Sequence, residues 1–476
     1  MAKVKLGKNL SKLSLLNSSY KEKYGFSDKI KNKVDFGKGL NEKTVKAISD
    51  YKKEDKYMQD FRINAYKTFK EKQMPNWGPD LKDLDFSSFH YFVKAQDNKQ
   101  LNWEDVPNKI KTTFDKLGVP KAERKFLAGV ATQYESEVVY QKLKEKWDKL
   151  GLIFLDTDSA YKKYPELFKK YFGKIVPPSD NKFSALNSAV WSGGSFIYVP
   201  KGVKINIPLQ TYFRINLKNI GQFERTLIIA DEGSEVHYIE GCTAPIYSTD
   251  SLHSAVVEVI VKKNAKVRYT TLQNWSINVY NLVTKRALVQ ENGVMEWVDC
   301  NLGSKVTMKY PSLYLVGDNS YGEVLSLALA NKGQIIDSGT KAIHKGKNSK
   351  SLIISKSVSL NGGESTFRSL VQMNSPTQNS HSKISCEALL FDDRSKTNTY
   401  PTNILSVKDC SIAHEASVSK IDSEQLQYLK SRGLSKEQAS AIILNGFLEP
   451  ITKELPMEYA VELNALINMS MEGSVG

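Results

Sequence analysis

Residues 351–363 read SLIISKSVSLNGG, and this stretch decides the fold that we expect for the chain. Apolar side chains fall on one face of an extended segment and serines on the other: Leu352, Ile354, Val358 and Leu360 against Ser355, Ser357 and Ser359. Such alternation is typical of a β-strand, because successive side chains point to opposite faces of a sheet. Asn361-Gly362-Gly363 then predicts a turn.

Similar strands and turns recur on both sides of this stretch. The turn signals are Glu232-Gly233, Lys263-Asn264, Glu291-Asn292-Gly293, Asp318-Asn319, Asn331-Lys332-Gly333 and Asn361-Gly362-Gly363. Several successive steps are 27 to 31 residues long, and one at residue 331 is shorter. A repeat of this length without helices predicts a parallel β-helix, in which each coil lies directly above the last. The alternative from the pattern alone is a large antiparallel sandwich.

The two flanks have a helical pattern, so we expect four parts. Residues 1–150 form a helical domain with a basic, flexible stretch over the first 40, and residues 151–184 connect it to the β-helix. Residues 185–417 form the β-helix, and residues 418–476 form a C-terminal helical domain. Within the first part, Thr44–Lys72 lacks Gly and Pro. Pro120–Lys149 has helical spacing of Phe126, Val130, Tyr134, Val138 and Leu143.

The end of the chain carries clear helix boundary signals. Ser435 and Gln438 form a capping-box pair, and Gly446 is expected to end that helix. Pro456 opens a final helix with one apolar stripe, made of Ala460, Leu463, Leu466, Ile467 and Ser470. These helices either cap the β-helix or form a docking platform for a partner.

Composition narrows the class of protein. The chain has 476 residues and a net charge of +15, from 58 Lys but only 9 Arg. Few arginines argue against nucleic-acid recognition, where the guanidinium fork is preferred. Met1–Leu16 lacks the apolar core of a secretory signal, and no apolar run reaches the ~18 residues of a membrane span. We expect a soluble intracellular protein with reduced thiols.

Four cysteines are the candidates for chemistry. Cys386 precedes His414-Glu415, and a thiolate with an imidazole can hold iron or transfer sulfur, although from the sequence alone such a pair is more often a coincidence than a site. Cys242 lies beside Gly and Pro at a strand end, so we expect it to be exposed. Its two interpretations are a persulfide acceptor and a packed turn residue. Cys300 and Cys410 are interpreted as core. Motifs for ATP hydrolysis, serine hydrolases and zincins are absent.

Several ordered stretches together resemble the SufB/SufD family of scaffold subunits of the SUF iron–sulfur assembly system, and its SufB branch in particular. They are QYESEVVY (133–140), NSAVWSGGSFIYVPKGVKINIP (187–208), EGCTAP (240–245), VTKRAL (283–288), NLGSKVTMKY (301–310) and MEGSVG (471–476). The resemblance covers most of the chain after residue 115. It implies the same fold as the pattern: a central right-handed parallel β-helix between helical ends.

The resemblance also implies roles for particular residues. Cys242 matches a sulfur acceptor, and Cys386, His414 and Glu415 match the site of the nascent iron–sulfur cluster, of the 4Fe-4S or 2Fe-2S type. The residues that match a sulfur route through the β-helix interior are Arg214, Asn216, Gln273, Trp275 and Lys285. Lys285 and Arg214 would also favour the Cys242 thiolate. Reduced FAD is a weaker implication of the same resemblance, because no motif in the chain supports it.

The implied partners define the expected function. In this family the SufC ATPase docks on the C-terminal helices, SufD or a second SufB pairs with the β-helix, and SufS/SufE-type donors deliver sulfur. The chain is then a scaffold and not an enzyme, in bacterial cytoplasm or a plastid-type stroma.

Two departures from the family pattern concern the cluster site, where Ala413 and Ser395 replace a family glutamate and a cysteine. Two alternative functions remain: a β-helix hydrolase or lyase that acts on polysaccharide, and a basic nucleic-acid-associated protein.

Overall fold

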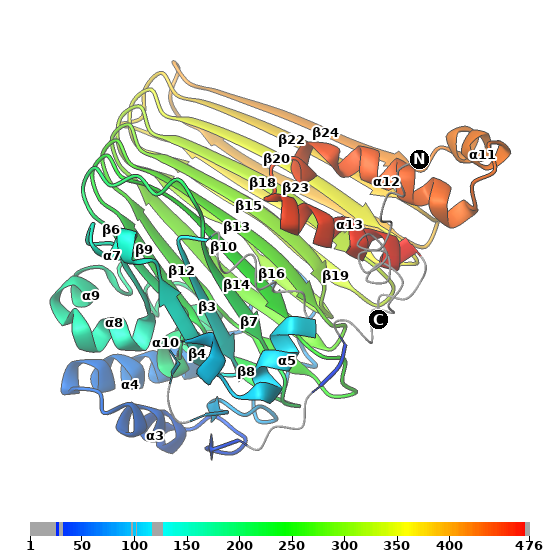
Figure 1. The fold of residues 1–476 in the computed structure, drawn as a ribbon. Coiled ribbons are helices and arrows are strands. Elements are labelled where there is room, and N and C mark those ends of the chain that lie inside the picture. The colour runs from blue at the N-terminus through cyan, green and yellow to red at the C-terminus, as the bar shows by residue number, and fades with distance from the viewer. Residues whose placement is uncertain (1–24, 28–31, 97–98, 101, 117–126, 472–476) are drawn as a thin grey trace, which may run out of the picture.

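A computed structural model describes residues 25–27, 32–96, 99–100, 102–116 and 127–471. Two long sheets wind around a common interior, which confirms the predicted β-solenoid with helical ends (Figure 1). The first sheet has ten strands: β24 (Ser411–Lys420), β22 (His381–Leu390), β20 (Lys350–Ser359), β18 (Tyr321–Ala330), β15 (Val294–Gly303), β13 (Lys266–Trp275), β10 (Glu235–Thr243), β7 (Leu209–Arg214), β3 (Gly129–Tyr134) and β4 (Glu137–Leu143).

The second sheet has twelve strands and closes the opposite side of the solenoid. Its main path is β23 (Lys396–Leu405), β21 (Glu364–Met373), β19 (Ile335–His344), β16 (Val306–Lys309), β14 (Val279–Val289), β12 (Val256–Val261), β9 (Arg225–Ala230), β6 (Ser195–Val199) and β5 (Ile153–Asp156). The short strands β8 (Gly221–Gln222), β11 (Ser251–His253) and β17 (Ser312–Leu315) pair beside this path. The separate pair β1 (Val34–Asp35) and β2 (Val93–Lys94) is antiparallel.

Parallel pairing from coil to coil sets the architecture and excludes the antiparallel sandwich. Glu235 lies beside Lys266, Lys266 beside Val294, and Val294 beside Tyr321, so each coil returns to the same edge after 27 to 31 residues. The same parallel register continues through β24. Because the coils stack directly, each inward position of one strand faces the equivalent position of the next.

Asparagines in left-handed conformation form ladders at the corners of the coils. Asn264, Asn292, Asn319, Asn348 and Asn379 all have φ between 47° and 58°. Their amides bond along the stack, from Asn292 Nδ2 to Asn264 Oδ1 at 2.9 Å and from Asn379 Nδ2 to Asn348 Oδ1 at 2.9 Å. Asn tolerates this backbone region better than other residues with a Cβ.

The short step at residue 331 belongs to a different corner. Asn331 and Asn361 follow β18 and β20 at the opposite end of these strands, and Asn361 Nδ2 donates to Asn331 Oδ1 at 3.0 Å. The turn signals in the sequence therefore come from two separate ladders. Their superposition, and not an irregular coil, explains the uneven spacing.

The N-terminal part is only partly helical. Its helices are α3 (Glu42–Lys52), α4 (Lys56–Glu71), η1 (Trp103–Asp105), α5 (Asn108–Lys116), α7 (Glu145–Asp148), α8 (Thr157–Lys163), α9 (Pro165–Tyr171) and α10 (Lys182–Val190). The gap between α3 and α4 occurs at Lys53, which is left-handed. The flexible stretch expected over the first 40 residues lies mostly outside the described residues.

The prediction of a helix over Pro120–Lys149 is wrong. The described part of this stretch contains the antiparallel pair β3 and β4, and β3 joins the ten-stranded sheet through β7. All six residues of β3 are buried, so apolar groups occur on both of its faces. A short strand that is buried on both sides has no clean alternation, and a helical interval can match it by chance.

Two buried ion pairs fix the N-terminal helices to the solenoid. Arg62 on α4 makes a bidentate contact with Glu54, with both distances 2.7 Å, and also donates to the Trp191 carbonyl at 3.1 Å. Arg225 on β9 pairs with Glu258 on β12 at 2.9 Å, and both side chains are fully buried. Each guanidinium has further main-chain acceptors, as a buried charge requires.

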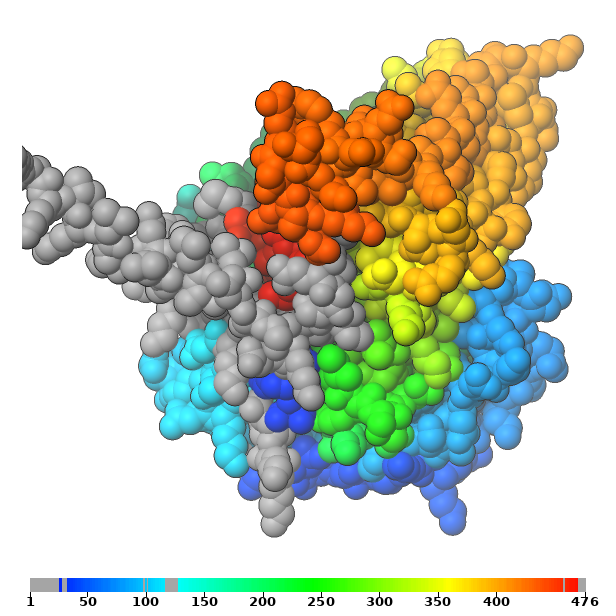
Figure 2. All heavy atoms as spheres, turned by 90° about the vertical axis from the view of Figure 1, so that its right-hand side faces the viewer, coloured from blue at the N-terminus to red at the C-terminus, as the bar shows by residue number. Residues whose placement is uncertain are grey.

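Three C-terminal helices follow the last coil: α11 (Ser423–Ser431), α12 (Lys436–Thr452) and α13 (Met457–Met471). Leu444, Leu448 and Ile451 of α12 are fully buried, in one cluster with Leu325 and Leu327 on the outer face of β18. The apolar faces recognised in the sequence therefore point outward, beneath these helices, and the serines of β20 point inward. Figure 2 shows this C-terminal part (orange) and the N-terminal helices (blue) at opposite ends of the molecule.

The capping box at Ser435 and Gln438 is present, but α12 does not end at Gly446. It continues through Gly446 and Pro450 to Thr452. A helical glycine costs only about 1 kcal/mol relative to alanine, and the apolar residues beyond it are buried against the sheet. No helix in the part of the chain that the structure describes is long and apolar enough to cross a membrane.

The asparagine ladder yields a first prediction. Asn292→Ala should lower the free energy of unfolding by roughly 1 kcal/mol or more, because alanine is strained at φ 52° and loses the amide bond to Asn264. Asn292→Gly should cost less, because glycine adopts positive φ without strain. Chemical denaturation of both variants checks the order. Equal losses would show that the left-handed backbone is not what the asparagine provides.

Candidate functional site

A row of polar side chains crosses the interior face of the ten-stranded sheet. Register pairs its members one after another across six strands: Glu240, Thr271, Asp299, Ser326, Ser355 and Cys386. Inward direction follows from their neighbours two positions away, Tyr238, Tyr269, Trp297, Val324, Ile353 and Ile384, which belong to the central apolar core. We call this set the inner polar row. The row ends at Cys386, and its first member, Glu240, is two residues from Cys242.

Cys242 lies two residues beyond Glu240 on the same face of β10, where it pairs in register with Gln273. Its Sγ is 3.7 Å from Glu240 Oε1, and the Tyr269 hydroxyl donates to the other oxygen of this carboxylate. The expectation that Cys242 is exposed is wrong, since the residue is 1% exposed. The reason is that β10 continues through Thr243, so Gly241 and Cys242 belong to the strand and not to a turn.

The surroundings of Cys242 disfavour its thiolate. Burial raises the pKa of the thiol well above its usual value of 9.0, and the nearby carboxylates of Glu240 and Glu224 raise it further. Lys285 and Lys309 oppose this increase without cancelling it. Lys285 thus acts in the predicted direction, yet the thiol stays protonated in the isolated chain. A change in solvation or in the charge of Glu240 is needed to activate it.

Two lysines reach the inner polar row from the opposite sheet. Lys285 on β14 donates to Thr271 Oγ1 at 2.6 Å and lies 3.3 Å from Asp299 Oδ1. Lys309 on β16 lies 2.9 Å from Asp299 Oδ2 and donates to Gln273 Oε1 at 2.9 Å. All of these side chains are buried. The interior therefore holds a charged cluster that joins the two sheets.

The pKa values of this cluster follow from burial and pairing. Burial opposes ionisation of Asp299, but Lys309 and Lys285 outweigh it and lower its pKa to about 2. Burial lowers the pKa of Lys309 to about 8, despite the attraction of Asp299. At neutral pH the cluster is thus a carboxylate between two cations, one of which gives up its proton near pH 8.

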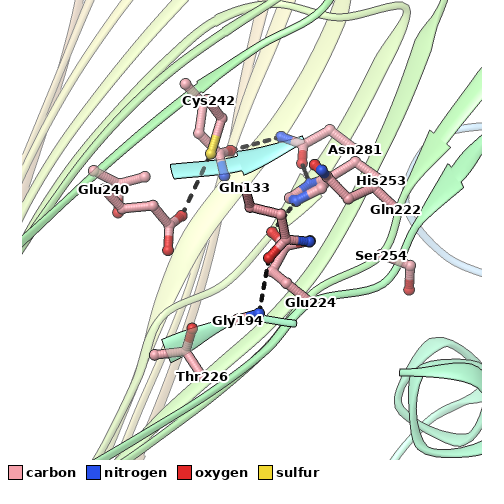
Figure 3. A network of polar contacts seen from close by, with 12 residues as sticks. Gln133, Gly194, Gln222, Glu224, Thr226, Glu240, Cys242, His253, Ser254 and Asn281 are labelled. Carbon is pink, nitrogen blue, oxygen red and sulfur yellow. Dashed lines mark hydrogen bonds and ion pairs between the residues drawn. The ribbon is translucent and has the colours of Figure 1, made fainter. Parts of the chain in front are cut away.

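A second hydrogen-bonded chain lies beside Cys242 (Figure 3). Asn281 Nδ2 donates to Gln273 Oε1 at 2.8 Å, and Asn281 Oδ1 is 2.7 Å from His253 Nδ1. The other nitrogen of His253 contacts Glu224 Oε1, and the ring of His253 packs 4.6 Å from that of Trp275. Gln273 and Trp275 therefore lie in the interior of the solenoid.

Some polar atoms around Cys242 have no hydrogen-bond partner in the protein. Among the described residues, Glu224 Oε2, Gln273 Nε2 and Trp275 Nε1 are buried without a hydrogen bond. Buried polar atoms are normally paired with protein or ordered water. These atoms leave hydrogen-bonding capacity unused around Cys242, and we call this part of the interior the Cys242 chamber.

Arg214 differs from the expectation that it lines this interior, and for Asn216 that expectation stays a prediction. Arg214 pairs in register with Thr243, so it lies on the opposite face of the sheet from Cys242. It donates to Thr243 Oγ1 at 3.1 Å and to the Phe26 carbonyl at 2.5 Å. Asn216 follows the end of β7, and its main-chain NH donates to Glu135 at 3.1 Å. The period of two along a strand explains the difference for Arg214.

Cys386 and His414 meet near the open end of the solenoid. Cys386 Sγ is 3.5 Å from His414 Nε2, and β24, which carries His414, is the last strand of its sheet. Burial raises the pKa of Cys386 to about 12 and lowers that of His414 below its usual value. His414 is therefore on the edge strand and Cys386 is one strand from it, with its side chain 5% exposed.

Glu415 is not brought to this pair. It follows His414 directly on β24, so its side chain points to the opposite face, where it is exposed. Within the described residues, no three His, Cys, Asp or Glu side chains are grouped closely enough to hold a metal ion. The described residues therefore bring together a thiol and an imidazole at this point.

The remaining cysteines are buried, as predicted. Cys300 is fully buried in the cluster beneath the C-terminal helices, on the outward face of β15. Cys410 precedes β24, and its sulfur accepts from the main-chain NH of Ser380 at 3.3 Å.

Several residues that this site uses were not selected from the sequence: Glu224, Glu240, His253, Asp299 and Lys309. For Glu240 a signal existed, because it is two residues from Cys242 on a predicted strand and so shares its face. The lysines meet Asp299 across the interior from another sheet. No local pattern reveals such a contact.

Comparisons with known proteins agree with this arrangement. Residues 213–447 match the family model "SUF system FeS cluster assembly, SufBD core domain", and residues 40–211 match "SufBD protein N-terminal region". Iron–sulfur cluster assembly SufBD family proteins of Staphylococcus haemolyticus, Staphylococcus aureus and Staphylococcus epidermidis are each 57% identical over 454 residues. These alignments cover 95% of this chain and 98% of each relative.

The carboxylate beside Cys242 gives a pH prediction. Glu240→Gln should shift the titration of the Cys242 thiol to lower pH, because it removes a negative charge that disfavours the thiolate. The ultraviolet difference spectrum of thiolate formation, referenced to Cys242→Ser, measures the midpoint. A midpoint that stays unchanged or rises would show that Glu240 does not control this thiol.

The charged cluster gives a stability prediction. Asp299→Asn should lower the free energy of unfolding by about 3–5 kcal/mol, because Lys285 and Lys309 then lose their buried carboxylate. Adding Lys309→Met should restore part of the loss, since one unpaired cation is removed as well. Denaturation of the single and double variants measures both. A double variant no more stable than Asp299→Asn would contradict the pairing.

Proposed function

Because the chain belongs to the SufBD family of iron–sulfur cluster assembly proteins, we propose that it acts as the SufB-type scaffold on which a nascent cluster is built. The inner polar row, which leads from the neighbourhood of Cys242 to Cys386, is the observation that carries this proposal. A buried polar row is costly as packing alone. A path for sulfur through the solenoid gives it a purpose.

In this proposal, Cys242 receives sulfur from SufS/SufE-type donors as a persulfide. Glu240 takes up the thiol proton when the chamber opens, and Lys285 and Lys309 stabilise the developing anion. A pair of external thiols then reduces the persulfide, which restores the Cys242 thiol, releases hydrogen sulfide and leaves their own disulfide. The released sulfide moves along the inner polar row, where hydroxyl and lysine donors replace its hydration.

The row spans five strand steps from β10 to β22, which corresponds to roughly 24 Å. Ser326 and Ser355 are its middle members, and each is nearly fully buried. Hydroxyl groups can donate to a hydrosulfide anion and accept from hydrogen sulfide. Sulfide thus reaches Cys386 without leaving the solenoid.

At Cys386 the delivered sulfide meets iron, the substrate of assembly. Cys386 and His414 supply a thiolate and an imidazole, a pair suited to an iron–sulfur cluster. Glu415 joins them only if the edge strand twists or a partner reshapes it. The further ligands come from SufD or a second copy of the chain, which pairs with the open end formed by β23 and β24.

The open end and the C-terminal helices have the surface that such partners need. Each of β23 and β24 ends its sheet, and Ile404, Leu405 and Val418 there are exposed. An exposed strand edge pairs readily with a strand of another chain. Tyr428, Ile442 and Val461 are exposed on α11 to α13, where we place the SufC ATPase. ATP-driven movement of SufC would open the buried Cys242 chamber.

Two measurements test the proposal. Cys386→Ala should lose most of the cluster formed on anaerobic reconstitution with iron and sulfide, because the thiolate ligand is gone. His414→Ala should weaken it, while Cys300→Ala, a buried cysteine outside the row, should retain it. Visible absorption and Mössbauer spectra follow the cluster. Equal clusters in wild type and Cys386→Ala would contradict the assigned site.

The path is tested with Ser355→Val, which blocks the inner polar row with a larger, apolar side chain. This variant should assemble cluster slowly from a persulfide donor and normally from free sulfide. The matched control Ser385→Val lies beside Ser355 on the same sheet but on its other face. A normal rate from the persulfide donor in Ser355→Val would contradict an internal path while leaving the Cys386 site intact.

A further inference from the structure

A cleft of about 710 Å³ lies on the outer face of the twelve-stranded sheet. The loop after α4, with Lys72 and Trp77, and the start of α10, with Lys182, form its wall. The floor is made by outward side chains of β14, β17, β19, β21 and β23. It is separated from the inner polar row by the thickness of the solenoid wall, and the sulfur path does not use it.

One row of the floor carries cations. Register places Arg286, Ser312, Lys341, Leu370 and Thr402 side by side across five strands. Arg286 pairs with Asp180 at 2.7 Å. Lys341 is half-buried, and within the described residues no carboxylate forms an ion pair with it. Burial and the neighbouring Arg286 lower the pKa of Lys341, and the carboxylate of Asp180 opposes this decrease.

The wall adds to this positive charge. Lys182 Nζ donates to the main-chain carbonyls of Phe69 and Lys72, at 2.8 and 2.6 Å. These are dipoles and not carboxylates, so its charge is not neutralised. The lining of the cleft therefore includes one carboxylate, that of Asp180, and five cationic side chains: Lys72, Lys182, Arg286, Lys341 and Arg368.

The adjoining row of the floor carries aromatic rings. Tyr400 lies in register with Arg368, whose guanidinium is 4.3 Å from the Tyr400 ring centroid and is held by Asp337 at 2.9 Å. Trp77 on the wall faces Tyr310, with ring centroids 5.4 Å apart. Trp77 and Tyr400 are each 50% exposed, although large aromatic side chains are usually buried.

Rings and cations are therefore separated by two residues along the strands, a distance of about 7 Å. We propose that this cleft binds a small anion that carries a planar ring, of the size of a nucleoside monophosphate. The ring would pack against Trp77, Tyr310 and Tyr400, and the phosphate would bind Lys341 and Lys182. The volume is in the range of small-molecule sites, which favours such a ligand over an extended acidic peptide.

Isothermal titration of the full chain with adenosine monophosphate tests the proposal. Lys341→Gln should weaken binding about tenfold, because it removes a charge-assisted bond to the phosphate, and Trp77→Ala should weaken it through loss of the ring contact. Lys345→Gln and Tyr428→Ala remove an exposed cation and an exposed ring outside the cleft. Both controls should bind as wild type does.

Three results would overturn the proposal. The first is adenosine monophosphate binding no more tightly than inorganic phosphate, which would leave an unspecific anion site. The second is equal loss in the control variants. The third is no binding of adenosine monophosphate. Its displacement by a short polyglutamate peptide would likewise contradict the proposal, because it would assign the cleft to an acidic polypeptide. All readouts are independent of cluster assembly, so failure here leaves the role of Cys242 and Cys386 untouched.

Discussion

Parallel backbone pairing between successive coils is the constraint on which the rest of this structure depends. It holds each strand directly above the previous one, so a residue at one position of a coil lies beside its equivalents in the coils before and after. Side chains far apart in the sequence therefore form continuous rows. The interior row from Glu240 to Cys386 and the exterior row from Arg286 to Thr402 both arise in this way.

Rows of polar groups inside a solenoid are expensive, and the chain offsets the cost in two ways. Asp299 is ionised between Lys285 and Lys309, which come from the other sheet and so join both walls of the solenoid. Ser326 and Ser355 carry no charge and need only hydrogen bonds. Where the pairing stays incomplete, around Gln273 and Trp275, the polar atoms surround the Cys242 chamber. Incomplete pairing thus coincides with the place where the proposed function needs room for sulfur.

The two ends of the solenoid are managed differently. At the N-terminal end, β4 and β5 turn antiparallel, and the sheet is covered by helices, among which the buried pair of Arg62 and Glu54 fixes α4. At the other end, the structure leaves β23 and β24 with their edges open and their side chains largely exposed. An uncovered edge of two ten-residue strands favours pairing with another chain. Cys386 and His414 lie beside this edge, so a partner's residues could complete an iron site there.

The sequence by itself determined the class of fold, since alternation and recurrent turns at Asn292 or Asn361 are local properties of the chain. The residues alone marked Cys242 and Cys386 as candidates, and the family resemblance added their roles and the interior residues Gln273, Trp275 and Lys285. It could not decide which face each residue takes, so Arg214 and Glu415 were assigned to sites that their strand positions exclude. A strand buried on both faces, β3, had no pattern to separate it from a helix.

Only the tertiary structure decided which residues act together. Asp299 meets Lys309 because two sheets close around one interior, and Trp77 meets Tyr310 because a loop folds onto the outside of the solenoid. The burial of Cys242 depends in the same way on neighbouring coils. Local patterns encode the period and the turns, because these follow from a few adjacent residues. Charges, exposed fractions and pKa values depend on contacts between distant segments, which only the assembled coils define.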